Sequence, residues 1–422
     1  MILVSIDTLS ASHLAAFDPD APEHPALDTF ARGAHRFVRA YSTASWTLPS
    51  HASVFTGLYP VRHGAVARGY RLPDDMPTLA ECAEGAGYQT VAFTGGGYLD
   101  PTFGLDRGFE RYSVDPPEPS DAADPFRPVV EFLRQRRDER PLFLFAHTYL
   151  VHDYFEAHPW ARAETEPFED PDRETYLTCL RGEIDCPASW WSRMADLYAA
   201  EIRAVDRAFG ELLTAFDEAG LEDPLILVFS DHGEGFEPER RRIHHGGRLH
   251  KDMLHVPLMM AGPDVQAGRS SVPVSLVDLM PTVVDHLGWS CSSNGDGDGD
   301  GATGFDGRSL VPLLTGGTLP ERPLFASEFF YDWSDGPRVN APRLERPHLE
   351  SVIAGDRWLI VGDHEVELYD LDDTMQRHDL APTDQAPEDL SRLLGDRDAI
   401  DGWQAAEEDP EVRRRLEALG YL

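Results

Sequence analysis

The sequence predicts an α/β protein in which a large, mostly parallel β-sheet lies between helices. Short apolar runs of strand length alternate with longer runs of helical period, as residues 142–146 and 195–219 illustrate. Strands that alternate with helices form parallel sheets covered on both faces. A chain of 422 residues, 41% of them hydrophobic, is long enough to bury such a core.

The predicted elements follow one another along the chain in this alternating order. Strands of the large sheet are expected at residues 2–6, 90–93, 142–146 and 225–229, with helices at 76–86, 129–136 and 195–219. Shorter strand-like runs then lie at 351–354, 358–361 and 365–371, before a terminal helix at 411–422. We therefore expect a large domain over residues 1–315 and a smaller α+β subdomain over 316–422.

The charge of the chain is strongly acidic. Lysine and arginine together number 37 against 74 acidic residues, a formal net charge of −37, and Lys251 is the only lysine. Such a composition is typical of proteins from molar salt, where the Debye length falls to about 3 Å and carboxylate repulsion is screened. We expect a halophilic protein with an acidic surface and no nucleic-acid partner, because phosphates would be repelled.

Cysteine spacing and hydropathy bear on disulfide bonding and on cellular location. Cys179 and Cys186 fit either a short loop disulfide or free buried thiols, and the four cysteines form no C-x-x-C pair. No apolar run approaches the roughly 18 residues of a membrane span, and no leader precedes the first strand. As the sequence stands we expect a cytoplasmic protein; a signal upstream of Met1 would change this expectation to export.

Polar side chains follow several predicted strands at the point where each strand ends. Asp7 comes directly after the first strand, and Asp231 and His232 come after the fourth; His147 and His152 follow the third. The carboxyl ends of parallel strands meet at one edge, where sites gather. Hard carboxylates with one imidazole suit a divalent cation. A lone strand-end aspartate also fits a simple helix cap.

The segment 44–53, Ala-Ser-Trp-Thr-Leu-Pro-Ser-His-Ala-Ser, is a second candidate. Pro49, two residues after Thr47, fits a strand that turns into a helix starting near Ser50. Free amides at a helix start bind anions. The same residues also fit an ordinary capping turn.

Together these fragments resemble the sulfatase family of the alkaline phosphatase superfamily. That family's signature is a cysteine or serine, one residue, proline, serine and usually arginine, then a Thr-Gly-Leu-Tyr-Pro run, and residues 45–64 are similar to it. Residues 5–9 resemble the family's opening metal-ligand motif. Other similar segments extend the resemblance over essentially the whole chain: 143–154, 198–206, 230–234, 245–258, 305–310 and 367–371.

The resemblance implies an alkaline-phosphatase-like catalytic domain over residues 1–315 and a C-terminal subdomain packed near the site. It also implies a set of site residues with distinct roles. These are metal binding by Asp7, Asp231, His232 and Thr47, nucleophilic attack by Thr47, oxyanion binding by His152, and assistance to the leaving oxygen by His245.

Three positions depart from the family pattern. Thr47 cannot become the formylglycine that sulfatases make from cysteine or serine, so we expect none. His51 replaces the arginine, so a fixed positive charge is lost or becomes pH-dependent. Thr8 replaces a second aspartate, which suggests a single divalent ion: Mn, Ca, Mg or Zn.

Lys251 fits either a plain surface position or an anion-binding charge at the rim of the site.

The sequence leaves three functions open. The first is a metal-dependent hydrolase of sulfate or phosphate-type esters, acting through Thr47 on a small-molecule or glycan ester. The second is a transferase that moves a phosphoryl or phosphoglycerol-type group from Thr47 to a glycan or lipid acceptor. The third is a binding protein that kept the fold without turnover, against which the intact Asp7, Asp231 and His232 speak.

Overall fold

The computed structural model describes most of the chain. The described residues are 1–67, 69–114, 124–156, 158–170, 172–180, 184–237, 242–291, 304–329, 349–362, 366–373, 376–381, 386–395, 404–406 and 410–418. Residues 419–422, at the end of the predicted terminal helix, lie outside them.

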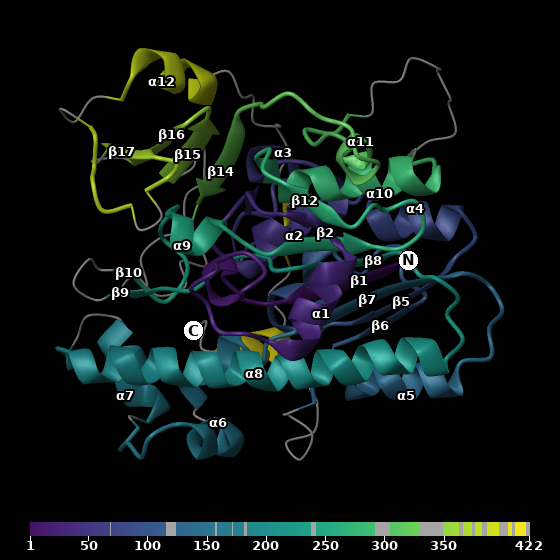
Figure 1. The fold of residues 1–422 in the computed structure, drawn as a ribbon, viewed down its shortest axis with the longest axis horizontal. Helices are drawn as coiled ribbons and strands as arrows, with labels where there is room; N and C mark the ends of the chain where they lie inside the picture. Colours follow the sequence, from purple (N-terminus) through teal and green to yellow (C-terminus); the bar gives the residue numbers. More distant parts are fainter. Residues whose placement is uncertain are drawn as a thin grey trace.

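Within these residues, a mixed sheet of eight strands crosses the middle of the molecule (Figure 1). Its order is β12-β2-β11-β8-β1-β7-β5-β6. Only β11 runs against its neighbours, so the prediction of a large mixed, mostly parallel sheet is confirmed. The strands are β1 (Ile2–Ile6), β2 (His35–Phe37), β5 (Gln89–Phe93), β6 (Arg111–Ser113), β7 (Leu142–Thr148), β8 (Ile226–Phe229), β11 (Leu258–Ala261) and β12 (Gly268–Ser270).

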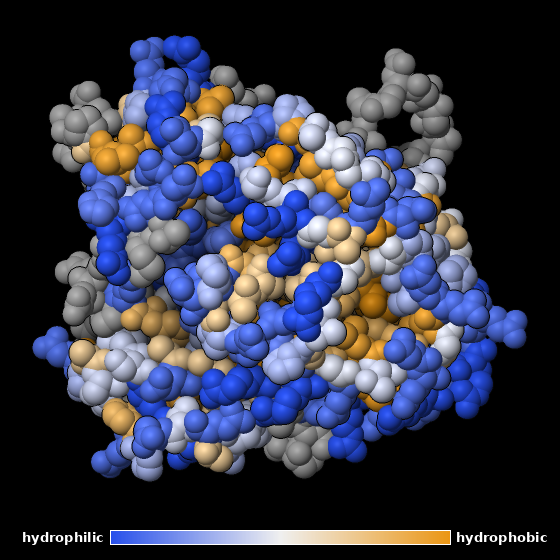
Figure 2. Space-filling model, viewed as in Figure 1, coloured by the Kyte–Doolittle hydropathy of each residue, from blue (hydrophilic) through white to orange (hydrophobic). Residues whose placement is uncertain are grey.

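Helices cover both faces of this sheet, as Figure 1 shows. Side chains on β1 alternate between the two layers: Ile2, Val4 and Ile6 pack into one apolar cluster, and Leu3 packs into the other. The solvent side of the long helix α8 is mainly hydrophilic (Figure 2). One layer contains α1 (Pro25–Gly33), α5 (Arg127–Gln135) and α8 (Ala188–Glu218), and the other contains α2 (Thr47–Thr56), α4 (Leu79–Gly85) and α10 (Leu279–Leu287).

A separate antiparallel sheet forms the core of the C-terminal subdomain. It consists of β14 (Leu324–Glu328), β15 (Leu349–Ala354), β16 (Arg357–Gly362) and β17 (Val366–Asp370), with α12 (Glu388–Gly395) packed against β15. The chain then returns to the large domain. There β18 (Gln404–Ala405) pairs with β4 (Tyr70–Arg71), and α13 (Pro410–Ala418) buries Val412 and Leu416 beside the large sheet. The domain boundary at residue 316 stays a prediction.

Lys251 lies between the two parts of the molecule. It begins the short helix α9 (Lys251–Leu254), and its Nζ donates to the carbonyl of Leu371, 3.2 Å away. Its backbone N–H donates to Oε1 of Gln376 at 2.7 Å. Lys251 therefore joins the segment after β17 to the large domain, and its side chain is partly buried rather than a plain surface position.

All four cysteines are paired. Cys82 of α4 is bonded to Cys291, which follows α10, across a sequence separation of 209, and Cys179 is bonded to Cys186. The first bond ties two helices of one layer together, a long-range pairing that spacing alone could not reveal. No described helix combines the length and apolar character that crossing a membrane requires.

We predict that the denatured, unreduced protein carries no thiol that reacts with a colorimetric thiol reagent. Reduction should expose four thiols per chain and lower the free energy of unfolding, because a disulfide restricts the unfolded chain by about 2–5 kcal/mol. Thermal melts with and without reductant measure the effect. Four reactive thiols before reduction would contradict both pairings.

Candidate active site

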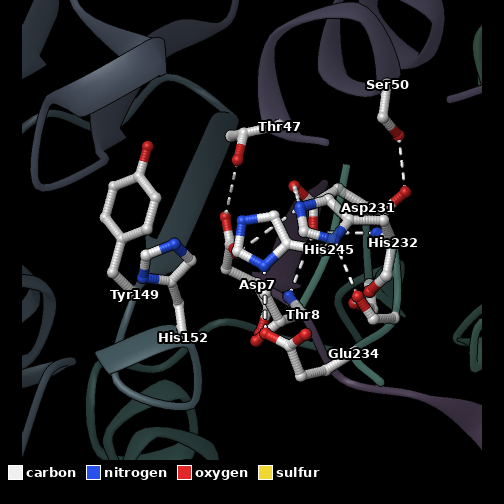
Figure 3. Close-up of polar contacts among 12 residues, drawn as sticks. Asp7, Thr8, Thr47, Ser50, Tyr149, His152, Asp231, His232, Glu234 and His245 are labelled. Carbon is white, nitrogen blue, oxygen red and sulfur yellow. Dashed lines mark hydrogen bonds and ion pairs between the residues drawn. The ribbon is translucent and has the colours of Figure 1, made fainter. Parts of the chain in front are cut away.

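The strand ends bring Asp7, Asp231 and Thr47 together at the carboxyl edge of the large sheet. Asp7 directly follows β1, and the hydroxyl of Thr47 donates to its Oδ2 over 3.2 Å. His232 Nε2 lies 3.7 Å from Asp7 Oδ1 and 3.5 Å from Asp231 Oδ2. The side chains of Asp7, Asp231 and His232 are 0% exposed. Figure 3 shows Thr47 pointing into this cluster from above.

A strained backbone at Thr8 shapes the floor of the site. Thr8 has φ 58°, a left-handed conformation that is unfavourable for a β-branched residue. This turn directs its N–H to Asp231 Oδ1 at 3.3 Å, while its hydroxyl donates to the carbonyl of Asp7. The hydroxyl of Tyr198, on α8, donates to the Thr8 carbonyl at 2.8 Å and so holds the turn. Thr8 thus contacts Asp231 through its backbone rather than its side chain.

The helix α2 begins at Thr47 itself, three residues before Ser50. Trp46 precedes it in an extended conformation. The first amides of an α-helix have no carbonyl partner within the helix itself. Ser50, on the same turn, donates to the backbone carbonyl of Asp231 at 2.7 Å. This bond joins the helix start to the end of β8 and fixes the direction in which Thr47 points (Figure 3).

His51 occupies the position of the family arginine without supplying a fixed charge. Its Nε2 lies 2.9 Å from Ser5 Oγ, and its Nδ1 lies 2.9 Å from the carbonyl of Thr47 and 3.4 Å from Asp231 Oδ2. Burial lowers the pKa of His51 to about 4. The ring is therefore neutral near pH 7, and its two nitrogens connect Ser5 of β1 to the first residue of α2.

His147 is a site residue that the sequence identified only as a strand-end histidine. It lies within β7, opposite Ser5, rather than after the strand. Its Nε2 is 3.2 Å from Asp7 Oδ2, and its Nδ1 is 2.9 Å from the carbonyl of Thr94. His147 thus contacts the same carboxylate oxygen as Thr47. Alternation along β7 is the signal that places its side chain on the Asp7 side.

His152 and His245 form the second wall of the site. His152 Nδ1 lies 2.8 Å from Asp153 Oδ1; burial opposes its charged form, but Asp153, Asp7 and Glu234 together raise the pKa of His152. His245 Nδ1 lies 2.9 Å from Glu234 Oε2. The ring of His245 lies 4.7 Å from that of His232 and 4.9 Å from that of His152. Glu234 is a further site residue, for which the sequence pattern predicts no role.

The donor atoms of Asp7, Asp231 and His232 fit a divalent cation. Asp7 Oδ1, Asp231 Oδ2 and His232 Nε2 are buried and have no hydrogen-bond partner among the described residues. One ligand atom from each lies within 4.8 Å of the others. Burial and the neighbouring Asp231 carboxylate raise the pKa of Asp7 well above its usual value, so a cation would relieve the repulsion. Two carboxylates and one imidazole would hold it.

A carboxylate from the C-terminal sheet holds the segment before Thr47. Glu328, the last residue of β14, is 0% exposed and accepts bonds from Ser45 Oγ at 2.5 Å and Trp46 Nε1 at 3.1 Å. The sequence pattern does not reveal this residue, because 283 positions separate it from Ser45. Its only sequence signal is an acidic residue at the end of an apolar strand.

The site thus holds a buried hydroxyl beside two carboxylates at the edge of a mostly parallel sheet, and comparison with known proteins identifies the family of the chain. The sulfatase family model matches residues 1–289, so the chain belongs to the sulfatase family and is an ester hydrolase of that family. A choline-sulfatase from Rhizobium meliloti is 24% identical over 98% of this chain and 90% of its own length.

Other relatives agree with this assignment. An arylsulfatase K from Danio rerio is 34% identical, over 28% of this chain and 21% of its own. The crystal structure of a phosphonate monoester hydrolase from Agrobacterium radiobacter has a TM-score of 0.71 at 21% identity and covers 93% of each chain. At that identity the structural likeness supports the fold alone.

We predict that Glu328→Gln lowers kcat by roughly tenfold with little change in KM, because the amide cannot accept from both donors and the segment before Thr47 shifts. Steady-state kinetics measure the split. Glu350→Gln, on the neighbouring strand β15, is the matched control and should leave kcat unchanged. Equal effects of the two variants would show that Glu328 acts only through general stability.

Proposed function

We propose that the protein hydrolyses sulfate or phosphate-type esters with Thr47 as the nucleophile and one divalent cation at Asp7, Asp231 and His232. The observation that supports this most directly is the placement of the Thr47 hydroxyl, 3.2 Å from Asp7 Oδ2 beside three buried donor atoms without partners among the described residues. A bound cation supplies Lewis-acid stabilisation of negative charge there.

The remaining roles follow from the side chains that surround Thr47. Asp7 accepts the hydroxyl hydrogen bond, and Ser50 and His51 fix the helix that presents the hydroxyl. His152, whose pKa is raised, is placed to stabilise the anionic ester oxygens. His245, held by Glu234, is placed to assist the leaving oxygen.

We further propose that phosphate-type esters are cleaved better than sulfate esters. Threonine cannot form the aldehyde through which a formylglycine releases its bound group, so water must hydrolyse a Thr47 ester. The phosphonate monoester hydrolase fold and the choline-sulfatase relative are consistent with small ester substrates, and glycan esters remain within the proposed class. Transfer of the Thr47-bound group to an added alcohol, in competition with water, would identify the transferase instead.

The nucleophile prediction compares three variants on a matched aryl sulfate and aryl phosphodiester. Thr47→Ala should abolish both activities, whereas Thr47→Ser should keep part of each because the hydroxyl survives and only the stiff β-branched side chain is lost. Catalytic efficiency is the readout. The control is Thr56→Ala, at the other end of α2, where the hydroxyl donates to the carbonyl of Ala52.

Two results would change the proposal in different ways. Unchanged turnover of Thr47→Ala would remove Thr47 as the nucleophile and leave water as the attacking group. Faster cleavage of the sulfate by the wild type would refute the phosphate preference while sparing the nucleophile.

Metal dependence forms a separate prediction. Dialysis against a chelator should reduce activity by at least about 100-fold, because the charge on the reacting oxygens would lose its main stabilisation. Manganese, calcium, magnesium and zinc are then added back singly in high salt. Full activity of the chelated, metal-free protein, checked by elemental analysis, would rule out a catalytic ion.

A further inference from the structure

A second cluster of potential metal ligands lies next to the proposed active site. Glu234, His244 and His245 are almost completely buried, with exposures of 2%, 6% and 2%. One ligand atom from each lies within 4.8 Å of the others. The ring of His245 also lies 4.7 Å from that of His232, so the cluster adjoins the first site without sharing its ligands.

Both histidines face the same carboxylate. Glu234 Oε2 lies 2.9 Å from His245 Nδ1 and 3.5 Å from His244 Nδ1, and its Oε1 accepts the N–H of Gly235. Among the described residues, its ion pairs are with these two histidines and with no lysine or arginine. A buried carboxylate that lacks a fixed positive partner is costly unless a cation or hydrogen bonds compensate it.

The backbone at His244 is what brings the two adjacent rings together. Consecutive side chains of an extended segment point in opposite directions. His244 has φ 57°, and this left-handed turn lets its ring and that of His245 approach to 3.9 Å between centroids. The turn is held at both ends: the N–H of His244 donates to the Gly235 carbonyl, and its own carbonyl accepts from Arg248.

We propose that Glu234, His244 and His245 bind a zinc ion, at a second site distinct from that of Asp7, Asp231 and His232. Two imidazoles and one glutamate form a His₂Glu ligand set, which zinc prefers and which leaves a fourth position open. The first site has two carboxylates and one imidazole, a harder set that also suits calcium or magnesium. The inference goes beyond the proposed function but shares His245 with it: Nδ1 of His245 faces Glu234 and would bind the zinc, which leaves Nε2 of the same ring for the leaving oxygen.

The donor distances are compatible with a single ion. At about 2.0–2.2 Å per ligand, two ligands of one zinc ion lie no more than about 4.4 Å apart. Glu234 Oε2 lies 2.9 Å from His245 Nδ1 and 3.5 Å from His244 Nδ1, both within this range. The ring of His152 lies 4.9 Å from that of His245, so a positive charge here would stand beside the wall that we assign to anion binding.

Zinc stoichiometry of the full-length protein tests the proposal. Chelator-stripped protein is dialysed to equilibrium against a fixed free zinc concentration, and zinc per chain is measured by elemental analysis. The wild type should bind two ions and His244→Asn only one, because asparagine tolerates the left-handed backbone but removes the imidazole. Asp231→Asn should also bind one, at the second site. The matched control, His378→Asn at an 84% exposed histidine, should bind two.

A readout of stability separates lost ligation from lost folding. His244→Asn should melt at the wild-type temperature in chelator and show a smaller rise on adding zinc. If Glu234→Gln, a second variant, gives the same zinc count as His244→Asn, the assignment is strengthened.

Three other combinations of zinc ions per chain would lead to different conclusions. If the wild type binds one ion, and His244→Asn keeps this ion while Asp231→Asn loses it, the second site is overturned. Glu234 would then only accept hydrogen bonds, from His245 and from the N–H of Gly235. One ion lost in His244→Asn but kept in Asp231→Asn would support the second site and refute the first. Two ions in both the wild type and His244→Asn would place the extra ion elsewhere and overturn the proposal.

Discussion

The close approach of two buried carboxylates, Asp7 and Asp231, is the constraint on which the rest of the site depends. Both side chains are fully buried, and each raises the energetic cost of charge on the other. The parallel order of β1 and β8 brings them together, and the strained turn at Thr8 gives one of them a backbone hydrogen bond. The proposed cation would offset the repulsion within this pair.

Histidines, rather than lysine or arginine, surround the buried carboxylates at this edge of the sheet. Among the described residues, no lysine or arginine contacts Asp7, Asp231 or Glu234. His51 and His147 are neutral near pH 7, because burial lowers the pKa of each to about 4. Such imidazoles position neighbouring groups and offer hydrogen bonds but supply no lasting positive charge. In the proposed function, positive charge at this edge would therefore be supplied by the proposed cation and by His152.

The C-terminal subdomain contributes to the site at a distance. Glu328, at the end of β14 in the small sheet, accepts hydrogen bonds from Ser45 and Trp46 of the large domain. These two residues directly precede the proposed nucleophile. Lys251, the first residue of α9, joins the same two parts of the molecule. The small sheet is therefore part of what positions Thr47, which explains how a peripheral sheet can matter for chemistry at the large one.

The sequence by itself determined the parallel core and the three metal-ligand candidates, because apolar runs mark strands and Asp7, Asp231 and His232 directly follow two of them. It did not reveal β2 or β12, which are three residues long and too short to show a period. Only the tertiary structure decided that His51 is neutral, that Cys82 pairs with Cys291, and that Glu328 reaches Ser45. Burial and contacts across more than 200 positions arise from the packing of whole layers, and local patterns carry no record of them.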